Sequence, residues 1–163
     1  MPERAVLFTL PLPDAVERRA ARDYRLTVNS GDRPLTGDEI VSRSQDVDAV
    51  VCSVVDKMTA AVFSRLPARV RIVASFGVGT DHLDLAAAKA RGVVVTNTPE
   101  VLTDATAEVA LLLLLGAARR AYEGQEILRS GRWSGWAPTQ LMGHQLTGKR
   151  PRPTMPRRLP VSW

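Results

Sequence analysis

Short apolar runs and helix-like segments alternate along the first hundred residues of this chain. A short apolar run bounded by turn residues is typical of a buried strand, and strands that alternate with helices form a parallel sheet with helices on both faces. The expected strands are residues 5–10, 24–29, 48–55, 71–76 and 93–96. The expected helices are residues 15–23, 59–65 and 85–91, with one more opening at a capping-box pattern formed by Thr36 and Glu39. The sequence therefore predicts a doubly wound α/β domain.

The pattern changes after residue 100. Residues 103–122 contain neither Pro nor a turn cluster, so a single long helix is expected there. Its segment 111–115 consists of five leucines, which makes the helix apolar almost all round. A helix of this kind is normally buried between two bodies rather than lying on one sheet. We therefore expect it to expose an apolar stripe, and to promote self-association, wherever no second body covers it.

The charge of the chain is concentrated at one end. The chain of 163 residues has a formal net charge of +5, and residues 149–163 hold five of its 22 basic residues and no acid. The remainder therefore carries 17 basic and 17 acidic residues (22 − 5 = 17). Residues 150–163 are rich in Pro and Arg and are expected to be disordered. Nucleic-acid binding requires a basic stripe on a folded surface, so it is not expected here.

The number of cysteines and the lengths of the apolar runs indicate in which cellular compartment the chain is expected. A lone Cys52 excludes an internal disulfide and fits a reduced, cytoplasmic setting. The longest apolar run, residues 109–118, is about half the length of a membrane span. We expect neither export nor insertion into a membrane.

A glycine loop follows the fourth expected strand. Gly77 and Gly79 imitate the start of a dinucleotide fingerprint, but His82 stands where the third glycine belongs. The glycines could instead leave the amides of Val78 and Gly79 free to bind a small anion such as a carboxylate. A plain turn, in which the glycines only supply positive φ angles, explains the same spacing, and spacing alone favours it.

The surrounding sequence resembles a known family. The segments 76–84, 90–99 and 101–110 closely resemble the D-isomer-specific 2-hydroxyacid dehydrogenases, and 131–136 and 146–149 are also similar to that family, in its order. The resemblance is strong for residues 70–149, weaker for 1–69 and absent after Arg150. Within the family, the glyoxylate and hydroxypyruvate reductase branch is the most similar.

The resemblance implies an architecture and a set of site residues. Members combine a flavodoxin-like substrate-binding domain, here residues 1–100, with a Rossmann domain that binds NAD or NADP, and residues 101–149 would be the interdomain helix and connector. The amides of Val78 and Gly79 would bind the substrate carboxylate, Leu102 would line the substrate pocket, and Trp136 would border it. Thr106 would lie on the cofactor side. The family is usually homodimeric, and its ligands are small 2-oxo or 2-hydroxy acids.

Several of these residues also have a purely structural interpretation. Asp104 and Thr106 are residue types that cap the start of a helix. Trp133 and Trp136 fit packing better than ligand binding. The resemblance does not place a catalytic histidine at His82, and we expect no catalytic residue within the chain.

The chemistry of the family requires more than these residues. Hydride transfer needs a bound nicotinamide, a cation for the carboxylate and an acid/base, and in the family these lie within and after the nucleotide domain. The 163 residues contain no Gly-x-Gly-x-x-Gly, so no cofactor is expected to bind this chain well. We expect a truncated family member in which the Rossmann domain is absent and the isolated chain is inactive. The alternatives are a non-catalytic module that binds small carboxylates and an inert gene product.

Overall fold

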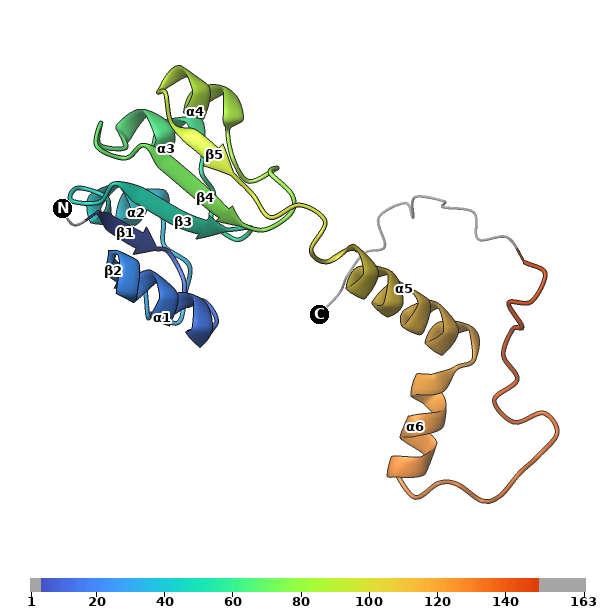
Figure 1. Ribbon diagram of the computed structural model, residues 1–163. Helices are drawn as coiled ribbons and strands as arrows, with labels where there is room; N and C mark the ends of the chain where they lie inside the picture. Colours follow the sequence, from blue (N-terminus) through green and yellow to red (C-terminus); the bar gives the residue numbers. More distant parts are fainter. Residues whose placement is uncertain (1–3, 150–163) are drawn as a thin grey trace. The chain divides into compact units, whose positions relative to one another are not determined.

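The computed structural model describes residues 4–149 and divides the chain into two compact units. Unit 1 ends at Leu102 and unit 2 begins at Thr103 (Figure 1). The Pro- and Arg-rich segment 150–163, for which disorder is expected, lies outside the described residues.

Unit 1 is built on a sheet of five parallel strands in the order β2-β1-β3-β4-β5. The strands are β1 (Ala5–Phe8), β2 (Arg25–Val28), β3 (Ala49–Ser53), β4 (Ile72–Phe76) and β5 (Val94–Thr96). The helices between them are α1 (Asp14–Asp23), α2 (Gly37–Arg43), α3 (Ala60–Arg65) and α4 (Leu85–Ala90). All nine elements match the expected order. The predicted doubly wound α/β fold is confirmed.

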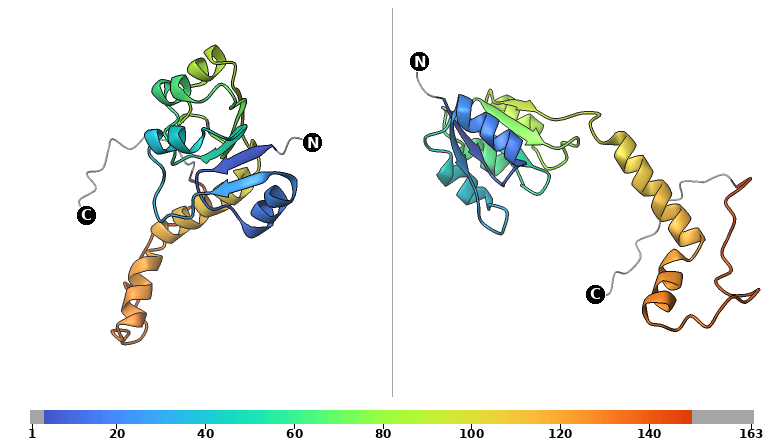
Figure 2. Two further views of the ribbon diagram at one scale, coloured as in Figure 1. Left: turned by 90° about the vertical axis from the view of Figure 1, so that its left-hand side faces the viewer. Right: turned by 60° about the horizontal axis from the view of Figure 1, so that its bottom comes forward.

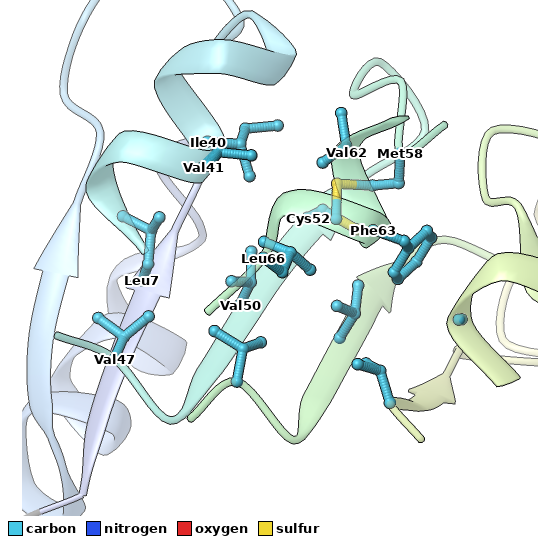
Figure 3. Packing of buried hydrophobic residues seen from close by; sticks show 14 of the residues in the cluster. Leu7, Ile40, Val41, Val47, Val50, Cys52, Met58, Val62, Phe63 and Leu66 are labelled. Atoms are coloured by element: carbon cyan, nitrogen blue, oxygen red, sulfur yellow. The ribbon is translucent and has the colours of Figure 1, made fainter. Parts of the chain in front are cut away.

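The main core lies on one face of the sheet. Alternate residues of the strands, including Leu7, Val50 and Val73, are fully buried against α2, α3 and α4. Figure 3 shows Phe63 of α3 among these side chains. Helix α2 begins with the predicted capping box, in which the amide of Glu39 donates to the side chain of Thr36 and the Glu39 carboxylate accepts from the Thr36 amide.

The other face of the sheet is covered only in part within unit 1. In the right-hand view of Figure 2, α1 lies in front of the strands, and its Ala20 packs with Val6 and Phe8 of β1. Beside α1, an open hollow of about 560 Å³ is lined in part by Val51 and Ile72. The expectation of helices on both faces is confirmed, with three helices of unit 1 on one face of the sheet and one on the other.

The described part of unit 2, residues 103–149, contains two helices, not one. Helix α5 (Thr103–Ala118) ends well before residue 122, and α6 (Ala121–Arg129) follows after Arg120, which adopts a left-handed backbone conformation with a φ of 54°. The expected single helix over 103–122 is therefore wrong. The cause lies in the connector, where the amide of His144 donates to the carbonyl of Ala118 and Gly143 lies against the same turn.

Candidate functional site

The candidate site lies where β3 and β4 end. These strands are paired in parallel, with Ser53 opposite Phe76, so the loops that follow them emerge side by side. A β-bridge between Met58 and Leu83 joins the two loops. Its hydrogen bonds run from the Met58 amide to the His82 carbonyl and from the Asp84 amide to the Met58 carbonyl, each 2.9 Å long. Ligands of open parallel sheets bind at this edge.

The loop after β4 is anchored through its carbonyl groups. The Thr98 amide donates to the carbonyl of Gly77 at 3.0 Å, and the Asn97 side chain donates to the carbonyl of Val78 at 2.8 Å. Within residues 4–149, the amides of Val78 and Gly79 donate no hydrogen bond. Two adjacent amides on a fixed loop can bind a small anion such as a carboxylate.

The two glycines of this loop do not supply the positive φ angles that the plain-turn interpretation expects. Neither Gly77 nor Gly79 has a positive φ angle. A Cβ atom on Gly77 would lie 2.6 Å from Cγ1 of Val54, so this glycine permits the close approach of the two loops. A Cβ atom on Gly79 would meet no atom within 4 Å, so this residue faces open space. The expectation that these two glycines supply positive φ angles is therefore wrong.

A cavity of about 540 Å³ opens beside Gly79. It is lined by residues of both loops: Val54, Val55, Lys57, Thr59, Gly79, Asp81 and His82. The side chains of Val54 and Val55 are more than half exposed. The cavity thus combines an apolar wall with a free amide and several polar side chains, the combination that is typical of small-molecule sites.

His82 is joined to the strand before the loop. Its Nε2 atom lies 3.0 Å from the hydroxyl oxygen of Ser75, which is 3% exposed. In the sequence, His82 stands out as a residue of the wrong type for a dinucleotide loop and as a histidine to which the resemblance gives no catalytic role. Ser75 does not stand out, because nothing in the local pattern distinguishes a strand serine with a distant partner from any other.

A buried carboxylate lies at the junction of β1 and β3, where the strand order changes direction. Asp56 is 1% exposed and accepts hydrogen bonds from the Thr9 hydroxyl at 2.6 Å and the Ser53 amide at 2.8 Å. Burial, with a smaller contribution from Asp56, raises the pKa of the Cys52 thiol to about 12. Cys52 is therefore a packing residue with no thiolate for nucleophilic chemistry.

The remaining predicted site residues lie outside this cavity. Leu102 is 45% exposed at the end of unit 1 and is not among the residues that line the cavity. Thr106 lies in the first turn of α5, where it is exposed. Trp136 is 80% exposed within the described residues, which does not fit the expected packing role, whereas Trp133 is 46% exposed and thus about half buried.

The loop after β4 does not fit the pyrophosphate of a dinucleotide. The close contact of Gly77 with Val54 fills the space through which a pyrophosphate would approach the backbone. The helix that follows the loop begins after Asp84, whose carboxylate already accepts from the Ala87 amide at the helix start. A carboxylate at that position would repel a phosphate.

Among residues 4–149, no group of three or more His, Cys, Asp or Glu side chains is arranged to hold a metal ion. In the same part of the chain, no helix is long and apolar enough to cross a membrane.

A five-stranded parallel sheet with helices on both faces defines an α/β domain, and comparison with known sequences shows to which family this domain belongs. Residues 6–147 match the family described as D-isomer specific 2-hydroxyacid dehydrogenase, catalytic domain. The chain belongs to this family, and the resemblance inferred from the sequence is confirmed.

Named relatives support the same membership. The chain is 40% identical over 149 residues to a glycerate dehydrogenase of Hyphomicrobium methylovorum, with 91% of this chain and 46% of the relative covered. It is 36% identical over 148 residues to a glyoxylate reductase of Pyrococcus furiosus, with 88% and 44% covered. The chain spans about half the length of the curated relatives it matches.

A solved structure shows the same fold. It is a protein from Polaromonas sp. JS6 66 described as an NAD-binding D-isomer specific 2-hydroxyacid dehydrogenase. It aligns with a TM-score of 0.82 at 39% identity and covers 90% of this chain and 46% of its own.

Proposed function

We propose that this chain binds a small 2-oxo or 2-hydroxy acid through the amides of Val78 and Gly79, as the carboxylate-binding part of a 2-hydroxyacid dehydrogenase. The observation that carries the proposal is the loop itself, whose carbonyl groups are anchored while its two adjacent amides are free. The cavity beside Gly79 provides room for the rest of a small acid. Leu102 and Trp136 are proposed to complete the substrate pocket.

The proposed reaction is the reduction of a 2-oxo acid to a D-2-hydroxy acid, or its reverse. The relatives named glyoxylate reductase and glycerate dehydrogenase support small acids of this class, with glyoxylate and hydroxypyruvate as the first to test. NAD or NADP supplies the hydride when bound, and the relative described as NAD-binding supports this cofactor. Thr106 is proposed to lie on the cofactor side of the site.

The part of this chain in that reaction is to hold and orient the acid. Amide donors at a carboxylate fix its position and leave the neighbouring carbonyl carbon accessible from the cavity side. The apolar side chains of Val54 and Val55 would exclude water from one side of the bound acid. Because no dinucleotide loop is present in the 163 residues, we expect the isolated chain to bind the acid without reducing it.

A second candidate function is a module that binds small carboxylates without catalysis. The free amides favour it, because they belong to unit 1 alone. The two candidates predict the same binding and differ in turnover only when a Rossmann domain is supplied. With such a domain added, NADH and NADPH absorbance in the presence of glyoxylate or hydroxypyruvate separates them, whereas we expect no oxidation by the isolated chain under either. Measurable turnover would contradict that expectation.

Binding itself is tested at Gly79. A Gly79→Pro substitution removes one amide donor, whereas Gly79→Ala keeps the amide and adds a methyl group into open space. Titration of the chain with glyoxylate, followed by amide chemical shifts, should show binding for the wild type and for Gly79→Ala. A hydrogen bond to a charged group contributes enough that Gly79→Pro should weaken binding about ten-fold or more. Equal affinities for the two variants would contradict the proposal.

A further inference from the structure

The loop that carries the free amides is closed at its base by one side-chain contact. Ser75 is the last but one residue of β4, and His82 is the last residue before the Met58–Leu83 bridge. The hydrogen bond between the Ser75 hydroxyl and Nε2 of His82, 3.0 Å long, therefore spans the loop from its entry to its exit. Between the two lie Gly77 and the residues with free amides, Val78 and Gly79.

The contact satisfies a group that would otherwise be unpaired. The Ser75 side chain is buried on the face of the sheet that carries the main core, and within the described residues His82 is the only partner of its hydroxyl. A buried hydroxyl without a partner is costly, so the pair favours the one loop conformation in which the imidazole returns to the strand. His82 also lines the cavity beside Gly79, so the same ring borders the candidate site.

We propose that His82 is a positioning residue that holds the Val78 and Gly79 amides in their anion-binding arrangement by its hydrogen bond to Ser75. This inference rests on the proposed function for its consequence, which is tighter binding of a small 2-oxo acid, but the ordering of the loop can be measured without any acid. Preorganised donors bind more tightly because less conformational freedom is lost on binding.

Loop order is measured first, in the full chain without ligand. Order parameters from ¹⁵N relaxation should be high at Val78 and Gly79 in the wild type and lower in His82→Leu and in Ser75→Ala. His82→Gln should restore order, because the glutamine amide reaches about as far as Nε2 and can bond to the serine. His144→Gln is the matched control, since His144 is an exposed residue of unit 2. Unchanged order parameters in both disrupting variants would overturn the inference.

Acid binding is measured second, by titration of the same proteins with glyoxylate. We expect His82→Leu and Ser75→Ala to weaken binding about five-fold and His82→Gln to bind close to the wild-type level. A wild type with an ordered loop that binds no glyoxylate would refute the proposed function and leave the positioning role supported. A wild type that binds, with His82→Leu and Ser75→Ala binding equally well, would refute the positioning role alone.

The His82→Gln variant separates positioning from a direct electrostatic role. A charged ring beside the cavity would itself attract a carboxylate, whereas a glutamine side chain carries no charge. The charged residues that line the same cavities as His82 are Lys57 from the loop after β3, Asp81 from its own loop and Asp84 at the start of α4. Positioning predicts that His82→Gln binds glyoxylate about as tightly as the wild type at pH 8. A deficit of His82→Gln as large as that of His82→Leu at this pH would count against the inference.

Discussion

At the scale of single residues, Asp48 links the amino-terminal ends of neighbouring strands. Its carboxylate accepts from the Ala5 amide at 2.8 Å and from two nitrogens of Arg69 at 2.8 and 3.2 Å. The Arg69 guanidinium, followed by the Ala5 amide, lowers the pKa of Asp48 from 3.8 to about 2. A carboxyl group with a lowered pKa in the folded state stabilises the fold above its unfolded pKa, and this contribution is lost as the pH falls from about 4 towards 2.

We therefore predict that Asp48→Asn lowers the Tm of unit 1 by a few degrees at pH 7, and that the difference from the wild type narrows as the pH falls from 4 to 2. Circular dichroism melting curves at several pH values measure both effects. Asp46→Asn is the control, because Asp46 is exposed and only its backbone carbonyl accepts a hydrogen bond in the described structure. A difference that stays constant down to pH 2 would show that the charge of Asp48 is not the cause.

At the scale of elements, the approach of the two site loops depends on the absence of a side chain at Gly77. We predict that Gly77→Ala lowers the free energy of unfolding of unit 1 by about 1–3 kcal/mol, the usual cost of overpacking, because the new methyl group would meet Val54. Urea denaturation measures the change. Gly79→Ala is the matched control and should be close to neutral.

Shortening the Val54 side chain tests whether a clash with it causes the loss of stability in Gly77→Ala. Combining Gly77→Ala with Val54→Ala should recover part of the stability, since the shorter side chain removes Cγ1 from the contact. A double variant no more stable than the sum of the two single losses would mean that the clash is not with Val54.

Helix α5 shows why the end of a helix cannot always be predicted from the local sequence. Residues 103–122 contain no helix-breaking residue at the point where the helix ends, so propensity alone continues it. The break depends on residues more than twenty positions later. The His144 amide donates a hydrogen bond to the Ala118 carbonyl. Gly143 lies so close to the same turn that a Cβ atom on it would be 2.3 Å from that carbonyl oxygen. A tertiary contact has overridden local propensity.

At the scale of the whole molecule, α5 is an exposed apolar element within the described residues. None of its residues is buried, and Leu111, Leu112 and Leu113 are each more than half exposed. We predict that the chain self-associates as its concentration rises, because a contiguous apolar surface of this kind favours association. The double substitution of Leu112 and Leu113 by Gln should shift it towards the monomer in sedimentation velocity experiments.

The control for this prediction is Leu85→Gln, which replaces a half-exposed leucine of unit 1 and should leave the association unchanged. A wild-type chain that stays monomeric over the whole accessible concentration range would contradict the prediction. So would equal association of the wild type and the α5 double variant.

The sequence by itself determined the order of the elements of unit 1, the capping box at Thr36 and the family, because strand runs, caps and family motifs are written in neighbouring residues. It also identified the loop whose amides form the candidate site. Only the tertiary structure showed how that loop is held, since the close approach of Gly77 to Val54 and the hydrogen bond between Ser75 and His82 join residues separated along the chain. Such contacts depend on how strands and loops pack in space, and no local pattern specifies them.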